Sequence, residues 1–390
     1  MMLERLGGIA RHGPIALRLL VVLPFLHVLH PVEPRATLQE PQQVVTSLPQ
    51  LCVHTRLIDE VLEWKIQRSL QLVREMGAGT IVEFFPWAYF ETSPGNHNWQ
   101  QADRILRHAG NQGLRVIARM GMVPAWARES GGQESPTTLN TLPPEAWDDF
   151  ADFVATFAAR YQDVVQHLII WNEPNLAFEW GHAAVSPQEY VELLRLTHDA
   201  VRAASPNTIL LAAGPAPTLE PVGSPQGMND LLWLEESFAA GAADWIDGLA
   251  LHSYGFAEAP EAPSARDRLN FRRAELQRET VQRYSDGEMA FFMTETGWND
   301  DPHHDLAVSP ARRIRYTLDA LRFSSRQWPW LGSLCLWALR YPAPSMNWRD
   351  GFTLITPEFL KKPIYHAVRK LASGQGNGDA LWLPPPVAPS

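Results

Sequence analysis

Two glutamates that follow apolar runs are the first candidates for chemistry in this 390-residue sequence. Glu173 follows the run 165–171 with Asn172 directly before it, and Glu295 follows the run 289–294. An isolated glutamate at such a place is usually a solvated loop carboxylate or a helix cap. Two of them beside apolar strands suggest a shared task, because ionised carboxylates are costly there. Hydrolysis of a glycosidic bond needs such a pair, one to protonate the leaving oxygen and one to attack the anomeric carbon or activate water.

The residues around the two glutamates suit a sugar ligand. Asn172 can hydrogen-bond a sugar hydroxyl and strengthen that contact in the transition state. The sequence holds 15 Trp against 8 Tyr and 16 Phe. Tryptophan in excess either thickens a large core or offers flat faces for ligands of low polarity. Trp171, Trp298 and Trp337 flank or end the runs that carry the polar residues, which favours a sugar.

The elements that must position these residues alternate between two kinds. Helical patterns separate short apolar runs of strand length, which indicates a parallel sheet covered by helices. Eight such units over about 320 residues predict an α/β fold with a single (β/α)₈ barrel. A doubly wound open sheet would favour a Gly-rich phosphate loop after the first run, and residues 54–59 contain no glycine. The eight runs are residues 51–54, 79–85, 114–119, 165–171, 208–213, 246–252, 289–294 and 331–337.

Local signals place the helices between these runs. A Ser-Pro-Gln-Glu capping box at 186–189 and a Ser-Pro pair at 309–310 predict helix starts, and Pro143-Pro144 opens another helical pattern. A glycine between a helix and the next strand suits the left-handed residue that ends a helix. These glycines are Gly77, Gly113 and Gly287. In a barrel the working groups lie at the C-terminal ends of the strands, where both glutamates are found.

Three strand motifs carry a resemblance to a known group. Residues 169–175 (Ile-Ile-Trp-Asn-Glu-Pro-Asn), 251–254 (Leu-His-Ser-Tyr) and 292–298 (Phe-Met-Thr-Glu-Thr-Gly-Trp) resemble the signature strands of the clan of retaining (β/α)₈ glycoside hydrolases. The details are most similar to cellulase-like and β-xylosidase-like members. An Asn-Glu-Pro tripeptide alone is a weak signal, but the ordered set is specific and covers residues 51–371. Further similar segments are 87–99 with Asp103, 124–126, 229–234 and 362–365.

The resemblance implies roles for the catalytic residues. Glu173 matches the general acid/base and Glu295 the nucleophile of a double displacement on β-linked sugars. Asn172 matches the residue that contacts the sugar 2-hydroxyl. No cofactor and no metal are expected, and the implied partner is an oligosaccharide or polysaccharide.

The resemblance also implies substrate-binding residues. His252 and Tyr254 match the sixth-strand pair that orients the nucleophile and the sugar. Trp337 matches the platform under the sugar in the first subsite. Trp126 and Trp298 are looser matches as cleft aromatics, and packing in the core or behind the cleft is an equal alternative for both.

One position departs from the pattern of these relatives. Many of them carry an arginine on the second strand that contacts the nucleophile, whereas residues 81–84 here read Ile-Val-Glu-Phe. Arg119, at the end of the third strand, is one substitute, although a surface salt bridge is the more ordinary role for it. The departure leaves the assignment of Glu295 as nucleophile in place, and it bears instead on which residue adjusts the reactivity of that carboxylate.

Composition excludes several other classes. With 33 Lys+Arg and 43 Asp+Glu the net charge is −10, so a nucleic acid is not expected as partner, and no protein partner is evident. Two cysteines exclude a disulfide scaffold and a cysteine zinc site. Cys52 and Cys335 fall on the first and last strands; we expect buried free thiols, with a disulfide as the alternative in an exported protein. Residues 303–305 (His-His-Asp) lack the spacing of a zinc site.

The ends of the chain differ from its centre. Three arginines precede the short apolar stretch 19–29, which is typical of a secretory signal, although no clear small-x-small cleavage site follows. We therefore expect a signal or membrane anchor plus linker at 1–49, the barrel at 50–372 and a flexible Gly/Pro-rich tail at 373–390. The protein is then secreted or membrane-anchored.

Two other functions fit parts of the sequence. A non-catalytic carbohydrate-binding barrel would explain the missing second-strand arginine as decay of the chemistry. An acidic, membrane-tethered interaction protein rests only on the N-terminal apolar stretch.

Overall fold

The computed structural model describes residues 35–38, 40–129, 137–285, 289–374 and 381–382. The chain divides into two units, residues 1–36 and 37–390, and every element below lies in the second. The predicted leader at 1–34 falls outside the described residues. Within the part of the chain that is described, no helix combines the length and hydropathy that crossing a membrane requires.

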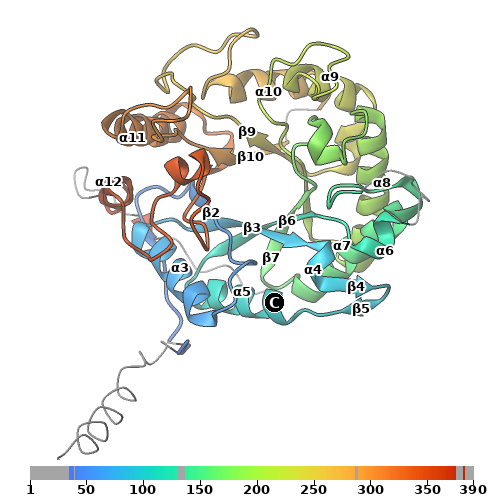
Figure 1. The fold of residues 1–390 in the computed structure, drawn as a ribbon, viewed down its shortest axis with the longest axis horizontal. Helices are drawn as coiled ribbons and strands as arrows, with labels where there is room; N and C mark the ends of the chain where they lie inside the picture. Colours follow the sequence, from blue (N-terminus) through green and yellow to red (C-terminus); the bar gives the residue numbers. More distant parts are fainter. Residues whose placement is uncertain (1–34, 39, 130–136, 286–288, 375–380, 383–390) are drawn as a thin grey trace, which may run out of the picture. The chain divides into compact units, whose positions relative to one another are not determined.

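Eight parallel strands close into a barrel, which confirms the predicted (β/α)₈ fold (Figure 1). Each apolar run predicted as a strand overlaps one of them, and three of the strands extend one or two residues past the predicted run. Each strand pairs in parallel with its two neighbours around the ring. The strands in chain order are β2 (Leu51–His54), β3 (Thr80–Pro86), β6 (Arg115–Gly121), β7 (Val165–Ile170), β8 (Ile209–Ala212), β9 (Gly248–His252), β10 (Ala290–Thr296) and β11 (Leu331–Leu336).

Helices connect successive strands and form the outer layer (Figure 1). Shorter elements lie in the loops after the strands: α4 (Trp87–Phe90), the hairpin β4 (Glu91–Ser93) and β5 (Asn96–His97), α6 (Ala125–Arg128), and the 3₁₀ turns η1 (Pro144–Ala146), η2 (Ala177–Trp180) and η4 (Trp348–Phe352). A further 3₁₀ turn, η3 (Ala242–Trp245), precedes β9. The main helices are α3 (Glu63–Met76), α5 (Gln100–Asn111), α7 (Trp147–Tyr161), α8 (Pro187–Ala204), α9 (Asp230–Ala239), α10 (Arg273–Gln282), α11 (Pro310–Gln327) and α12 (Pro363–Ala372).

The predicted helix signals are found where the sequence placed them. The Ser186 side chain accepts a hydrogen bond from the Glu189 N–H at the start of α8. The Ser309 side chain likewise accepts from the Arg312 N–H at the start of α11. Gly77 ends α3 with φ +89°, a left-handed conformation that costs other residues energy. Gly113 has φ +68° before β6, and Gly287 lies outside the described residues.

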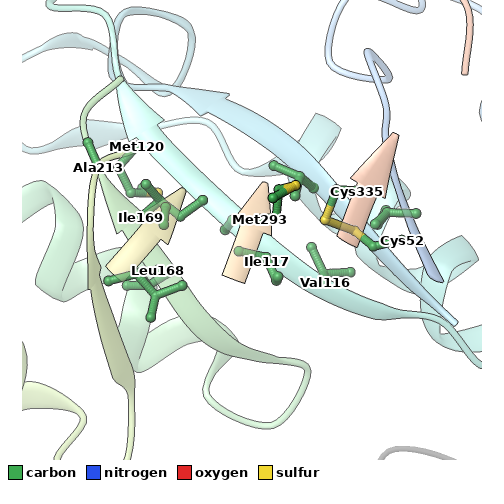
Figure 2. Close-up of a cluster of buried hydrophobic side chains, with 14 of the residues drawn as sticks. Cys52, Val116, Ile117, Met120, Leu168, Ile169, Ala213, Met293 and Cys335 are labelled. Carbon is green, nitrogen blue, oxygen red and sulfur yellow. A yellow bond between two sulfur atoms is a disulfide. The ribbon is translucent and has the colours of Figure 1, made fainter. Parts of the chain in front are cut away.

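The barrel interior is filled by side chains from several strands, so it is a packed core (Figure 2). Among these residues, Cys52 on β2 and Cys335 on β11 occupy the same register and form a disulfide, with an S–S distance of 2.18 Å. The expectation of two free thiols is therefore wrong. Closure of the barrel places the first and last strands side by side, which brings together two cysteines 283 residues apart in sequence.

Parts of the expected linker and tail contact each other and the barrel. Short strand β1 (Val45–Thr46) pairs with β12 (Leu381–Trp382), and Ser47 N–H donates to the Ala372 carbonyl at the end of α12. Val44 and Thr46 are buried. No signal in the sequence indicated this pairing, because a strand of two residues is too short to give a pattern.

Candidate active site

A cleft of about 490 Å³ opens at the C-terminal ends of the barrel strands. Residues that follow different strands line it, including Glu173 after β7, Glu295 on β10 and Trp337 after β11. These side chains are far apart in sequence and meet because the C-terminal ends of parallel strands share one end of a barrel. The prediction that they gather at this end is confirmed.

The two glutamates face each other in this cleft. One carboxylate oxygen of Glu173, one of Glu295 and a ring nitrogen of His252 all lie within 4.8 Å of one another. Glu295 is buried, whereas the side chain of Glu173 is 16 % exposed and open to the cleft. A buried carboxylate and a more accessible one therefore lie close together in the cleft.

The backbone around Glu173 is unusual. Trp171 has φ +80° and Glu173 has φ +40°, both in the left-handed region that residues with a side chain seldom adopt. Each such residue costs on the order of 1–3 kcal/mol, which the surrounding contacts must offset. Trp171 is held by its backbone N–H, which donates to Met120, and by its indole, which donates to the Glu179 carbonyl at 2.8 Å. Strain of this kind occurs at functional sites.

Glu295 accepts hydrogen bonds at both carboxylate oxygens. Arg119 Nη1 lies 2.9 Å from Oε1, and the Tyr254 hydroxyl donates to Oε2 at 2.8 Å. Arg119 is 7 % exposed, so the reading of it as a surface salt bridge is wrong. Burial, followed by the charge of Glu295, raises the pKa of Tyr254, so the phenol remains a donor at ordinary pH. Both partners hold the Glu295 carboxylate in one orientation.

His252 lies between the two glutamates. Its Nδ1 is 2.8 Å from Glu173 Oε1 and 3.8 Å from Glu295 Oε2. Burial acts to lower the pKa of His252, but the charge of Glu295 and the hydrogen bond to Glu173 outweigh it, and the pKa lies above its usual value. Of the two residues expected to orient the nucleophile and the sugar, Tyr254 contacts Glu295, whereas His252 lies closer to Glu173 than to Glu295.

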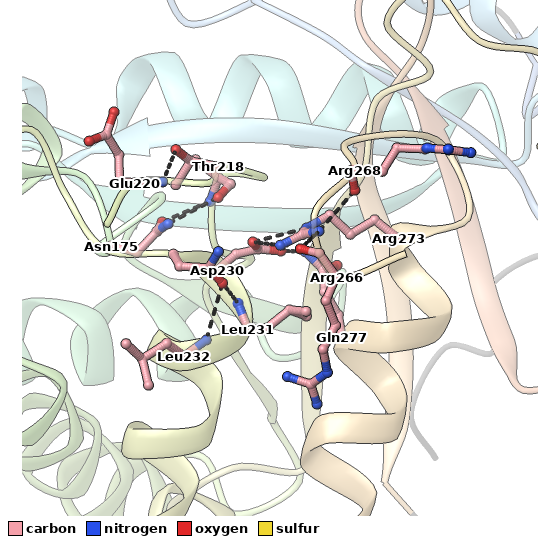
Figure 3. Close-up of polar contacts among 12 residues, drawn as sticks. Asn175, Thr218, Glu220, Asp230, Leu231, Leu232, Arg266, Arg268, Arg273 and Gln277 are labelled. Atoms are coloured by element: carbon pink, nitrogen blue, oxygen red, sulfur yellow. Dashed lines mark hydrogen bonds and ion pairs between the residues drawn. The ribbon is translucent and has the colours of Figure 1, made fainter. Parts of the chain in front are cut away.

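A buried ion pair joins helices α9 and α10 (Figure 3). Arg273 on α10 binds Asp230 at the start of α9 at 2.7 Å, and neither side chain is exposed. Gln277 donates to Asp230 at 2.9 Å and to the His252 carbonyl at 3.2 Å. A buried ion pair with hydrogen bonds of this kind holds its members in one geometry. It therefore holds the end of β9 in place.

His54, at the end of β2, is a site residue that sequence reasoning missed. Its Nδ1 lies 3.0 Å from the Thr55 carbonyl and its Nε2 lies 3.8 Å from Glu295 Oε1. Burial, followed by the charge of Arg119, lowers its pKa well below the usual value, so the ring is neutral. With a proton on Nδ1, Nε2 is an acceptor. The signal was available, because His54 ends a strand just as His252 does.

The predicted aromatic residues divide into two groups. Trp337 lines the cleft, with its ring 4.3 Å from that of His54. Trp298 is 1 % exposed and donates to the Glu258 carbonyl, so it offers no face to a ligand in this structure. Trp126 packs on Trp87 and is not among the residues that line the cleft. The structure thus favours the packing alternative for Trp126 and Trp298, because their indoles face neighbouring elements.

A third glutamate, Glu179 in η2, also lines the cleft and was not predicted. Burial and the nearby charge of Glu173 raise the pKa of Glu179 to about 7. The sequence gives no strand-end signal for this residue, because it lies six positions past Glu173 in an irregular loop.

One group of residues could hold a metal ion. Among the described residues, Glu173, His252 and Glu295 bring one possible ligand atom each within 4.8 Å of the others. All three belong to the cleft just described. The carboxylate oxygens and the ring nitrogen that could bind a metal already make hydrogen bonds to one another, to Tyr254 and to Arg119.

The fold and the placement of the carboxylates define a class of structure, a (β/α)₈ barrel with glutamates after the fourth strand and on the seventh. No protein-family model matches the sequence, and no curated protein matches it.

Solved structures of glycoside hydrolases share the fold. A family 39 glycoside hydrolase from Bacteroides cellulosilyticus is 18 % identical with a TM-score of 0.65, over 88 % of this chain and 66 % of that one. GH5_18 from Streptomyces cattleya, in complex with GlcNAc, is 18 % identical with a TM-score of 0.61, over 86 % and 80 %. A psychrophilic family 10 endo-β-1,4-xylanase is 14 % identical with a TM-score of 0.57, over 82 % and 95 %. The chain thus spans less than two thirds of the first of these proteins. The fold expected from the strand motifs is the fold of these glycoside hydrolases.

Proposed function

We propose that this protein is a glycoside hydrolase that cleaves β-linked sugars with retention of configuration, with Glu173 as acid/base and Glu295 as nucleophile. The observation that carries the proposal is the approach of the two carboxylates within 4.8 Å in an open cleft. Retaining enzymes have carboxyl groups about 5–5.5 Å apart, whereas inverting enzymes need about 6.5–9.5 Å to seat a water molecule.

The contacts suggest how the first step proceeds. Glu295 attacks the anomeric carbon, and Glu173 gives its proton to the leaving oxygen as the glycosidic bond breaks. The donors on Glu295, Arg119 and Tyr254, hold the carboxylate in one orientation. In the second step Glu173 takes a proton from water, whose oxygen attacks the glycosyl-enzyme and releases Glu295.

Side chains around the pair fit the binding of a sugar ring. Trp337 offers an aromatic face, and Asn172 offers an amide beside Glu173. The alternative of a non-catalytic binding barrel rested on the missing second-strand arginine. Because Arg119 contacts Glu295 at 2.9 Å, that reason for it is removed.

The proposal is tested with a panel of aryl β-glycosides and β-linked polysaccharides, and with separate Glu173→Ala and Glu295→Ala variants. Both variants should lose most hydrolysis of substrates with poor leaving groups. The Glu173 variant should still be glycosylated by an activated aryl glycoside, whose leaving group needs little protonation. Wild-type turnover in both variants, or binding without product over long incubation, would contradict it.

We also propose that the protein is exported or membrane-anchored. The positive leader with a short apolar run and the Cys52–Cys335 disulfide support this, because disulfides persist in oxidising compartments. Cell fractionation tests it, and a product confined to the reducing cytosol would count against it.

A further inference from the structure

The side-chain amide of Asn172 has a partner at each end. Its Oδ1 accepts from Arg119 Nη1 at 2.6 Å, and its Nδ2 donates to Glu179 Oε1 at 3.0 Å. The amide therefore has one orientation, since rotating it by half a turn would set two donors against each other at Arg119. The second N–H of Nδ2 has no partner among the hydrogen bonds of the described residues, and Asn172 lines the cleft.

Glu179 is itself held from the far side. Its Oε2 accepts from Asn140 Nδ2 at 3.0 Å, and Asn140 belongs to the loop before η1. A continuous line of hydrogen bonds thus runs from Glu295 through Arg119, Asn172 and Glu179 to Asn140. Because every link is a direct contact, a change at Glu179 removes the hydrogen bond to Asn172, and it also removes a charge that acts on Glu173.

We propose that Glu179 is a positioning residue, whose carboxylate fixes the Asn172 amide so that its free N–H meets the sugar hydroxyl next to the anomeric carbon. This inference rests on the proposed function and names a further residue in the same site. A contact to that hydroxyl strengthens in the transition state of glycoside hydrolysis, so its loss lowers the rate of the chemical step.

The titration of Glu179 gives a second readout. Burial, followed by the charges of Glu173 and Glu295, raises the pKa of Glu179 to about 7. The charge of Arg119 and the hydrogen bond from Asn172 act in the opposite direction and only partly offset this rise. The ionised form accepts from both asparagines at once. The ratio of wild-type kcat to that of a Glu179→Gln variant should therefore rise with pH through about 7.

The experiment compares four proteins on dinitrophenyl β-glycosides and their 2-deoxy analogues: wild type, Glu179→Ala, Glu179→Gln and Glu279→Gln. Glu279 is an exposed glutamate on α10, so its variant controls for net charge. The alanine variant should lower kcat/KM about 10- to 100-fold on the parent glycoside and less than about 3-fold on the 2-deoxy glycoside, which lacks the hydroxyl. The glutamine variant keeps an acceptor for Asn172, so it should recover most of kcat at pH 6. Equal losses on both substrates would overturn the proposal.

A crystal structure of the Glu179→Ala variant separates this inference from the proposed function. The inference expects Asn172 Oδ1 to stay on Arg119 while Nδ2, without its partner at Glu179, leaves its wild-type place or takes more than one position, even if no glycoside is hydrolysed. An Asn172 side chain that keeps its wild-type position and order in the variant would overturn it. Absence of activity in the wild type on every glycoside would instead overturn the proposed function, and the crystal structure would then decide this inference alone.

Discussion

Arg119 and Glu295 form a buried contact across the barrel, with Nη1 of the guanidinium 2.9 Å from Oε1 of the carboxylate. Their side chains are only 8 % and 7 % exposed. Arg119 comes from β6, whereas the arginine expected from the resemblance would come from β3. The guanidinium lies over the ring of Phe84 on β3, which keeps it directed into the cleft.

An Arg119→Met variant should lose most activity. Methionine removes donors to both Glu295 and Asn172, and loss of one such preorganised donor lowers kcat about 10²- to 10³-fold. Arg115→Met, at the opposite end of the same strand, is the matched control and should retain wild-type kcat. Steady-state kinetics on an aryl β-glycoside measures both. A kcat unchanged in Arg119→Met would show that the contact has no part in the chemistry.

Glu83 occupies the second strand and is fully buried. Its Oε1 accepts from the N–H groups of Leu57 and Ile58, each at 2.9 Å, and its Oε2 lies 2.5 Å from Thr55 Oγ1. Because the Thr55 hydroxyl can donate instead to the Val82 carbonyl at 3.1 Å, a protonated Glu83 can be the donor in the short contact. Burial raises the pKa of Glu83 to about 7, which fits this arrangement.

A Glu83→Gln variant should be the more stable protein above neutral pH. The pKa of Glu83 is about 7 when folded and 4.5 unperturbed, so the folded state binds more protons between these values and wild-type stability falls as pH rises through them. The loss is on the order of 3 kcal/mol at most. Glutamine keeps the donor and the acceptor without titrating. Urea unfolding at pH 5 and pH 8 tests this, and the same pH dependence in both proteins would contradict it.

The barrel and the residues at its strand ends could be predicted from the sequence, because both depend on local patterns of apolar and polar residues. Apolar runs bounded by helix caps located the strands, and Glu173 and Glu295 follow directly from where those runs end. The contact of Arg119 with Glu295 was expected only as one of two alternatives, because Glu295 comes from a strand that is not a neighbour of the Arg119 strand in the barrel and spacing does not decide between them. Likewise Trp298 follows a strand end but turns its indole into the core, a direction that spacing does not encode.

The disulfide should contribute measurably to stability. It joins the first and last strands across 283 residues, and disulfides typically contribute about 2–4 kcal/mol. Addition of a reductant should lower the melting temperature of the wild type but leave that of a Cys52→Ala/Cys335→Ala variant unchanged. Thiol titration of denatured protein purified without reductant should find no free cysteine in the wild type. Two reactive thiols per chain would contradict the disulfide.

The central claim is that Glu295 forms a covalent bond to the sugar. The direct measurement is mass spectrometry of the protein after incubation with an activated 2-deoxy-2-fluoro β-glycoside, followed by peptide mapping of the adduct. We expect one glycosyl group per chain, attached to Glu295, and none in the Glu295→Ala variant. An adduct on another residue, or inactivation that never occurs in a wild type shown to hydrolyse the parent glycoside, would contradict it.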